Sequence, residues 1–374
     1  MDNPFKNIFQ NIMNQFSGAS AGGSVIGVDI GTSSIKVVQL RKKNGKAVLE
    51  TYGALALGPY ADLDVGAVTN LPEDKLGVAL NDVVRESGVT TKEGGFSIPS
   101  VSSLIFVLEL PGAIDDKQFA TIVPTEARKY IPVPISEVVL DYWVIPKKEQ
   151  SLGDSITESD NSTKTEVLVA AIHNETISRY KNIVKKTDLA SGFFEIEVFS
   201  DIRSTFTHEL SPVMLLDFGA SRTKVVIVEY GIVKVFHIIN RGSQDITTAL
   251  SKSLSIPFQK AEEMKREFGL YGSSLDKSVA DITKLSVDYV LTEANSAVLG
   301  YERKYQKTVS KVILSGGGSM LKGFFEAART NFTCDVVLAD PFGKIEAPAF
   351  LENVLKTTGP EFAIAVGLAL RKLQ

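Results

Sequence analysis

VIGVDIGTSS, at residues 25–34, is an apolar run that ends in an aspartate and a short polar turn containing glycine. The run VMLLDFGASR, at residues 213–222, has the same ending. Each run is followed by a strand-like segment, a tight turn at residues 44–45 or 230–231, and another strand-like segment. A three-strand unit that occurs twice in one chain indicates two related lobes.

Length and composition restrict the class of protein. A chain of 374 residues with 44% hydrophobic and 22% charged residues is long enough for two compact lobes. The net charge of −4 argues against nucleic acid as a partner. The single cysteine, Cys334, fits a reducing compartment. No apolar run approaches the roughly 20 residues needed to span a bilayer, so we expect a cytoplasmic protein.

Apolar periodicity predicts an α/β protein with an insertion in its first lobe. Residues 193–199 are predicted to form a strand, residues 361–373 a helix, and the polar stretch 147–164 a mobile loop. The expected parts are an amphipathic helix and flexible linker (1–24), the first part of the lobe 1 core (25–100), an inserted α+β subdomain (101–172), the second part of lobe 1 (173–211), the first part of the lobe 2 core (212–242), a helical outer subdomain of lobe 2 (243–308), the second part of lobe 2 (309–358) and a closing helix (359–374).

The first candidate site is the turn at the end of the first apolar run. Gly31 lets the backbone approach a phosphate closely, and consecutive turn amides such as those of Thr32 and Ser33 can donate to its oxygens. Lys36 adds a positive charge, and Asp29 can hold a magnesium ion, usually through water. A D-x-G-T sequence also occurs in plain hairpin turns with an Asx cap, so this turn alone does not identify a site.

The second repeat supplies a matching turn, whose candidate phosphate ligands are Gly219, Ala220, Ser221 and Thr223. Its aspartate, Asp217, is a candidate metal ligand and a candidate catalytic residue. Two such turns that face each other would hold the β- and γ-phosphates of a nucleotide from both sides. We therefore expect ATP or ADP with Mg²⁺ in a cleft between the lobes.

Two further elements suit a nucleoside. One is the glycine turn after the apolar run KVILS, with the candidate ligands Gly316, Gly317, Gly318 and Met320. Three glycines at a strand end are costly unless something lies against the backbone, although a plain strand-to-helix turn can also contain them. The other is the pair Glu262 and Lys265, which share one face of a predicted helix. They can reach a ribose and a base, or form a solvated ion pair.

These four elements, in this order, resemble the superfamily of actin, the sugar kinases and the heat-shock chaperone ATPases. The place of the insertion resembles that in FtsA. The motifs EARKYIPVPISEVVLDY (126–142) and EFAIAVGLALRK (361–372) resemble the PilM family of type IV pilus assembly proteins. The resemblance covers residues 25–374. It implies an actin-like two-lobed fold with duplicated ribonuclease-H-like domains and an FtsA-like inserted α+β subdomain.

The resemblance also implies a function. It suggests a cytoplasmic ATP-binding platform for type IV pilus assembly, or for a related type II secretion machine, held at the inner membrane by a protein partner. A PilN-like membrane protein would insert its cytoplasmic N-terminal peptide into a groove lined partly by residues 101–145, and nucleotide would modulate this binding. Tyr130 and Ile131 are candidate groove residues, or else core of the insertion, where we also expect Trp143. Pilus motor ATPases and further copies of the chain are additional candidate partners.

Hydrolysis is expected to be slow or absent. Actin-type enzymes orient the attacking water with a glutamine or an equivalent residue, and the matching stretch, EVFSD at 197–201, does not align to one residue. Two other functions stay open. An FtsA-like cell-division protein would usually end in an amphipathic membrane helix, whereas this sequence ends directly after the predicted closing helix. A small-molecule kinase would need a catalytic carboxylate in a polar substrate pocket, and we find no motif for one.

Overall fold

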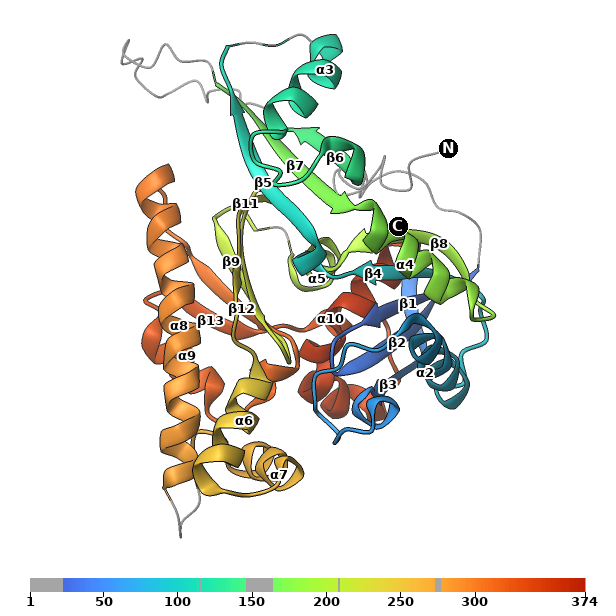
Figure 1. Ribbon diagram of the computed structural model, residues 1–374, viewed down its shortest axis with the longest axis vertical. Helices are drawn as coiled ribbons and strands as arrows, with labels where there is room; N and C mark the ends of the chain where they lie inside the picture. The colour runs from blue at the N-terminus through green and yellow to red at the C-terminus, as the bar shows by residue number, and fades with distance from the viewer. Residues whose placement is uncertain are drawn as a thin grey trace.

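The computed structural model describes residues 23–112, 114, 116–145, 164–207, 209–272 and 277–373. The predicted helix at residues 1–16 lies outside these residues, as does the predicted loop at 147–164 apart from Lys164. Within the described ranges, the strands form two five-stranded sheets and one three-stranded sheet (Figure 1).

The two large sheets have the same strand order, in which an antiparallel unit of three strands adjoins two parallel strands. In lobe 1 the order is β3 (Lys46–Ala56), β2 (Ser34–Lys43), β1 (Ser24–Ile30), β4 (Glu93–Ile98) and β8 (Ala190–Ile196). In lobe 2 the order is β11 (Ile232–Ile239), β10 (Thr223–Glu229), β9 (Val213–Phe218), β12 (Lys311–Ser315) and β13 (Asp335–Leu338). The predicted duplication is therefore confirmed.

Helices cover the sheets, which explains why β9 is apolar and buried along nearly its whole length. In lobe 1, one face packs on α2 (Glu73–Glu86) and α4 (Asn174–Lys185), and the other packs on α10 (Glu352–Leu373). In lobe 2, one face shares a core with α6 (Ser243–Leu254), α7 (Phe258–Phe268), α8 (Ser278–Tyr305) and α9 (Phe324–Asn331). Among the described residues, no helical stretch combines the length and the hydropathy of a bilayer span.

Two helices lie between the large sheets, α10 and α5 (Glu197–Thr205) (Figure 1). Their backbones approach so closely that a Cβ atom at Gly367 of α10 would overlap the carbonyl oxygen of Ser200 in α5. Beside this contact, the buried Glu195 forms ion pairs with Arg203 at 2.6 Å and with Arg371 at 2.9 Å. Burial by itself would raise the pKa of Glu195, but the two arginines outweigh burial and lower it.

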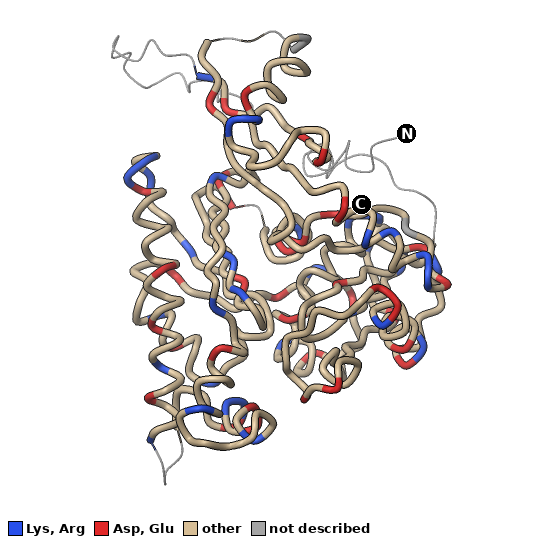
Figure 2. The backbone as a smooth tube through the Cα atoms, in the orientation of Figure 1, with Lys and Arg blue, Asp and Glu red and all other residues tan. Residues whose placement is uncertain are grey.

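The insertion forms its own small sheet, in the order β5 (Ser103–Leu110), β7 (Thr165–His173) and β6 (Val138–Val144), with α3 (Asp116–Ala127) at its tip (Figure 1). It meets lobe 2 through charged pairs. Lys234 on β11 pairs with Glu166, and Lys304 on α8 lies 2.9 Å from Glu109. Acidic and basic residues are interspersed along both lobes (Figure 2).

Two boundaries in lobe 1 differ from the sequence prediction. The strand predicted at 193–199 ends at Ile196, and Glu197 begins α5. Glu195, Ile196, Glu197 and Val198 alternate with the period of a strand, which hides the point at which β8 ends and α5 begins. The closing helix begins at Glu352, before its predicted start at residue 359, and continues through Pro360, a residue type that usually marks a helix boundary.

Two predictions for the insertion are also corrected. Trp143 does not lie in the core of this subdomain, since it is partly exposed and packs against the main core of lobe 1. Ile131 is a core residue of the insertion, only 7% exposed, whereas its neighbour Tyr130 is 57% exposed and stacks on Phe106. Ile131 therefore does not line a groove. Tyr130 remains accessible.

We expect Gly367→Ala to destabilise the fold by about 1–3 kcal/mol, because the added methyl group forces α10 away from α5. Gly300→Ala is the matched control. Gly300 lies in α8 with nothing near its Cβ position, so alanine there should stabilise the helix by up to about 1 kcal/mol. Urea unfolding of both variants measures the difference. Equal stability of the two would contradict the tight helix contact.

Candidate functional site

The two repeated turns have the same backbone geometry. The amide of Gly31 donates to the carbonyl of Ser34 at 3.0 Å, and the amide of Gly219 donates to the carbonyl of Arg222 at 3.0 Å. Each turn follows a buried strand and leads into an antiparallel one. The duplicated sequence therefore produces duplicated local structure at the atomic level.

Each hairpin also places a lysine directly across from its aspartate. Asp29 on β1 is opposite Lys36 on β2, and Asp217 on β9 is opposite Lys224 on β10. Both aspartates are 5% exposed. Because opposite residues of antiparallel strands point to the same face, each pair projects on one side of its sheet.

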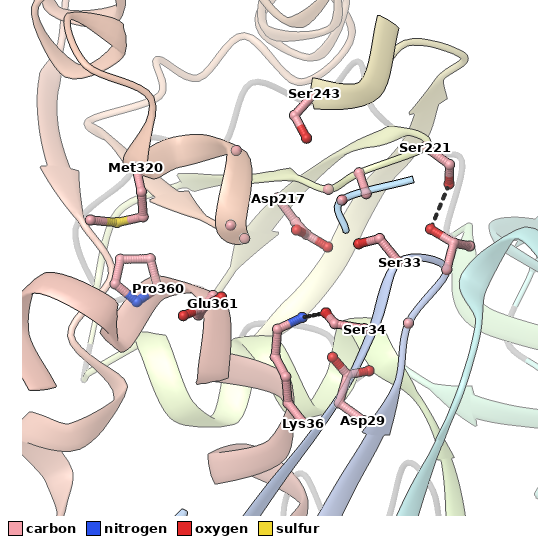
Figure 3. A pocket seen from close by; sticks show the side chains of 18 of the residues that line it. Asp29, Ser33, Ser34, Lys36, Asp217, Ser221, Ser243, Met320, Pro360 and Glu361 are labelled. Atoms are coloured by element: carbon pink, nitrogen blue, oxygen red, sulfur yellow. Dashed lines mark hydrogen bonds between the residues drawn. The ribbon is translucent and has the colours of Figure 1, made fainter. Parts of the chain in front are cut away.

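The turns meet across a cavity of about 590 Å³ between the lobes. The hydroxyl of Thr32 donates to that of Ser221 at 3.3 Å, which joins the tips of the two turns. Figure 3 shows Asp217, Ser33 and Lys36 around the same space. Consecutive amides, hydroxyls and a lysine suit a chain of phosphates.

Nearly all of the predicted site residues come together in this cavity. The lining includes Asp29, Gly31, Thr32, Ser33, Lys36, Asp217, Gly219, Ala220, Ser221, Glu262, Lys265, Gly316, Gly317, Gly318 and Met320. Thr223 is the exception. It is fully buried at the start of β10, where its hydroxyl donates to the carbonyl of Arg241 at 2.8 Å. Neighbouring residues of a strand point to opposite faces, so Thr223 points away from the side that Lys224 faces. Thr223 is therefore no longer a candidate phosphate ligand.

The glycine turn after β12 lies against the second aspartate. Gly316 has a φ of +80°, and a Cβ atom there would overlap Oδ1 of Asp217. Its amide donates to the carbonyl of Pro360 at 3.0 Å, which fixes the turn against α10. Met320 and Pro360 lie together on one side of the cavity (Figure 3). The glycine at position 316 is therefore required by both conformation and space.

Glu262 and Lys265 form a buried ion pair at 2.6 Å instead of a solvated one. Glu262 also accepts from the hydroxyl of Thr247 at 2.6 Å and from Arg266 at 2.7 Å. Burial alone would raise the pKa of Glu262, but the attraction of Lys265 outweighs it and lowers the pKa. A carboxylate held in this way is a fixed acceptor at the cavity wall.

The sequence prediction missed one charged residue that lines the cavity, Lys224. Its Nζ lies 2.8 Å from Asp217 Oδ2 and 2.8 Å from Glu197 Oε1. The burial of Lys224 by itself would lower its pKa, but the two carboxylates outweigh it and raise the pKa above the usual value. A signal was present in the sequence, because Lys224 follows Asp217 at the same spacing as Lys36 follows Asp29.

Two carboxyl groups near the aspartate turns have a serine partner. Ser97 donates at 3.0 Å to Asp29, which lines the cavity, and Ser315 donates at 3.0 Å to Asp201, which is buried next to Asp217. Burial raises the pKa of Asp29. Burial and the neighbouring charge of Asp217 raise the pKa of Asp201 well above its usual value. Both shifts favour the neutral form of these carboxyl groups.

Comparison with known proteins places these features in a family. The family described as type IV pilus assembly protein PilM matches residues 27–373. A curated relative, the cell division protein FtsA of Neisseria meningitidis serogroup B, is 24% identical, over 91% of this chain and 88% of that protein.

Solved structures show the same fold. A PilM-PilN type IV pilus biogenesis complex has a TM-score of 0.76 at 21% identity, over 94% of this chain and 98% of that chain. MreB5 of Spiroplasma citri bound to ADP has a TM-score of 0.50 at 9% identity, over 93% and 95%. The actin-like fold class expected from the sequence is confirmed.

We expect Gly316→Ala to destabilise the protein by about 1–3 kcal/mol, since it combines an unfavourable φ with an overlap at Asp217. Gly317→Ala is the matched control. The nearest atom to its Cβ position is Glu361 Cβ at 3.8 Å, an ordinary contact. Urea unfolding measures both, and a Gly316→Ala protein as stable as the Gly317→Ala protein would contradict the described turn.

Proposed function

Because this chain belongs to the PilM family of type IV pilus assembly proteins, as its motifs predicted, we propose that it is a nucleotide-binding platform for pilus assembly. One observation carries the nucleotide part of the proposal: two aspartate–glycine turns with the same backbone hydrogen bond face each other across one cavity. The family match spans nearly the whole chain. It favours pilus assembly over cell division or a small-molecule kinase.

In the proposed complex, the phosphates lie between the two turns. The amides that follow Gly31 and Gly219 donate to phosphate oxygens, and Lys36 supplies a positive charge. The nucleoside lies against the turn at residues 316–318 and near the Glu262–Lys265 pair, which border the same cavity. The related fold of MreB5, solved with ADP and with AMPPNP, supports this arrangement.

The carboxylates fit a magnesium ion that accompanies the phosphates. Mg²⁺ is usually held by one or two carboxylates together with phosphate oxygens and water. Asp29 and Asp217 border the cavity from the two lobes, and the Ser97 hydroxyl orients the Asp29 carboxylate. When bound, the ion would neutralise phosphate charge.

The partner is proposed to be the cytoplasmic N-terminal peptide of a PilN-like membrane protein, which would hold the platform at the inner membrane. The similar solved structure, a complex of PilM with PilN, supports this partner. An extended peptide needs a strand edge and accessible apolar side chains. In the described part of the insertion, β6 lies at an edge of the small sheet and all its residues are partly exposed. Tyr130 adds an exposed aromatic ring.

Nucleotide binding is tested by Asp29→Asn and Asp217→Asn. We expect micromolar affinity of the unmodified protein for Mg-ADP, about −8 kcal/mol, and at least about tenfold weaker binding by each variant. The loss should be smaller when EDTA removes the metal. Asp335→Asn, an exposed aspartate on β13, is the control. Titration calorimetry that gives unchanged affinity in both cavity variants would refute the site.

The partner surface is tested by glutamate substitutions at two adjacent residues. Tyr130→Glu should leave the melting curve unchanged and weaken binding of the PilN-like peptide at least about tenfold. Ile131→Glu should lower the melting temperature sharply, because it buries an unpaired charge. Tyr271→Glu, on an exposed tyrosine of lobe 2, is the control. Full peptide binding by the Tyr130→Glu protein would exclude this surface.

A further inference from the structure

The two repeated lysines occupy equivalent positions but have different partners. Lys36 donates to the hydroxyl of Ser34 at 3.0 Å and lines the cavity, so it can turn to an anionic ligand. Lys224 is held between Asp217 and Glu197, 2.8 Å from each. Of the two equivalent lysines, Lys36 is therefore available to bind a ligand, whereas Lys224 pairs with carboxylates of the protein.

The contact between Lys224 and Glu197 crosses from one lobe to the other. Lys224 lies on β10 of lobe 2, whereas Glu197 begins α5 directly after β8 of lobe 1. The two side chains are 13% and 10% exposed, so water screens their attraction only weakly. If the lobes separate at this point, the nearly buried Glu197 loses its charged partner, while Lys224 keeps only Asp217, and this separation is costly.

The same contact occupies one oxygen of a carboxylate that lines the cavity. Of residues 197–201, all of which the structure describes, Glu197 lines the cavity. Its Oε1 atom accepts from Lys224 Nζ at 2.8 Å and from the amide of Ser100 at 2.8 Å. A carboxylate oxygen has two lone pairs, so Oε1 has no acceptor capacity left for a water molecule, and only Oε2 could accept one. The two contacts to Oε1 also fix the orientation of the carboxylate, so Oε2 cannot turn freely toward a water.

We propose that Lys224 is a cross-lobe tie that keeps the cleft closed on a bound nucleotide and restrains Glu197 from activating water. The inference rests on the proposed function, since it requires a nucleoside triphosphate in the cavity. The inference explains the slow turnover that we expect. Glu197 is present as a carboxylate base, and Lys224 is a positioning residue that keeps it from taking a proton from water.

In the restrained reaction, a water oxygen bonds to the γ-phosphorus while the bond from that phosphorus to the β–γ bridging oxygen breaks. ADP and inorganic phosphate form, and the Glu197 carboxylate takes the proton of the water and passes it to solvent. Lys224→Met removes the ammonium group and keeps an unbranched side chain, which frees Glu197 without opening a large cavity.

Single-turnover phosphate release from ATP tests the restraint in the full chain. Lys224→Met should release phosphate at least about tenfold faster than the unmodified protein, because a positioned base contributes roughly 10²–10⁴-fold. Adding Glu197→Gln to this variant should abolish the gain. Lys36→Met, the matched change in the first repeat, should weaken ADP binding without any acceleration.

The outcomes separate the inference from the function on which it rests. If the unmodified protein binds no ADP, the proposed function fails. If ADP binds to both proteins and Lys224→Met releases phosphate no faster than the unmodified protein, the inference is wrong. If the double variant, Lys224→Met with Glu197→Gln, also releases phosphate faster than the unmodified protein, the acceleration comes from a general loosening of the site. That result would also overturn the inference.

A second variant keeps the inference testable if Lys224→Met does not fold. Glu197→Gln leaves Lys224 paired with Asp217 and buries no lone charge. Loss of the cross-lobe pair should accelerate dissociation of a fluorescent ADP analogue about tenfold, since truncating a buried charge pair acts mainly on the off-rate. Dissociation at the unmodified rate would show that the lobes are not tied here.

Discussion

The packing of α10 between the lobes is the contact on which the rest of the structure depends. At Gly27 of β1 a Cβ atom would overlap the carbonyl oxygen of Ala365, and at Gly367 one would overlap Ser200, so the helix touches sheet and helix with almost no side chain between. The hydrophobic core next to it is continuous across the lobes. Leu215 of lobe 2 and Phe199 of α5 belong to the same cluster. The same helix reaches lobe 2, where the carbonyl of Pro360 accepts from the amide of Gly316 at 3.0 Å, so α10 contacts both lobes beside the repeated turns.

Within that frame, the cleft floor combines requirements that oppose each other. A phosphate site needs amides and positive charge, whereas a metal needs carboxylates, and both must be shielded from water. Three nearly buried carboxyl groups, Asp29, Glu197 and Asp217, line the cleft, and the buried Asp201 lies next to Asp217. Lys224 pairs with Glu197 and Asp217, and serine hydroxyls donate to Asp29 and Asp201.

The sequence predicts the fold and the loops of the site well because both depend on a local pattern that occurs twice. It predicts less well where one element runs into the next without a break in the pattern. Glu195 to Val198 alternate like a strand, so the pattern indicates a strand where α5 begins and hides the place of Glu197. Lys224 is missed although it follows Asp217 at the same spacing as Lys36 follows Asp29, because the spacing does not reveal that Lys224 pairs with Glu197 of the other lobe. Trp143 is misplaced for a different reason: an apolar strand does not reveal which of two neighbouring cores receives its side chains.

The insertion is attached to both lobes, and this has a mechanical consequence. Its chain ends join lobe 1, while Glu166 and Glu109 pair with lysines of lobe 2. If the two lobes rotate relative to each other, the insertion cannot keep its contacts with both. It must move with one lobe and lose its contacts with the other. Lys304 is 52% exposed, so salt screens its pair with Glu109. Lys234 is 9% exposed, so salt screens its pair with Glu166 much less. Salt therefore weakens the Lys304–Glu109 contact more than the Lys234–Glu166 contact, so the insertion would lose its contact with α8 before its contact with β11.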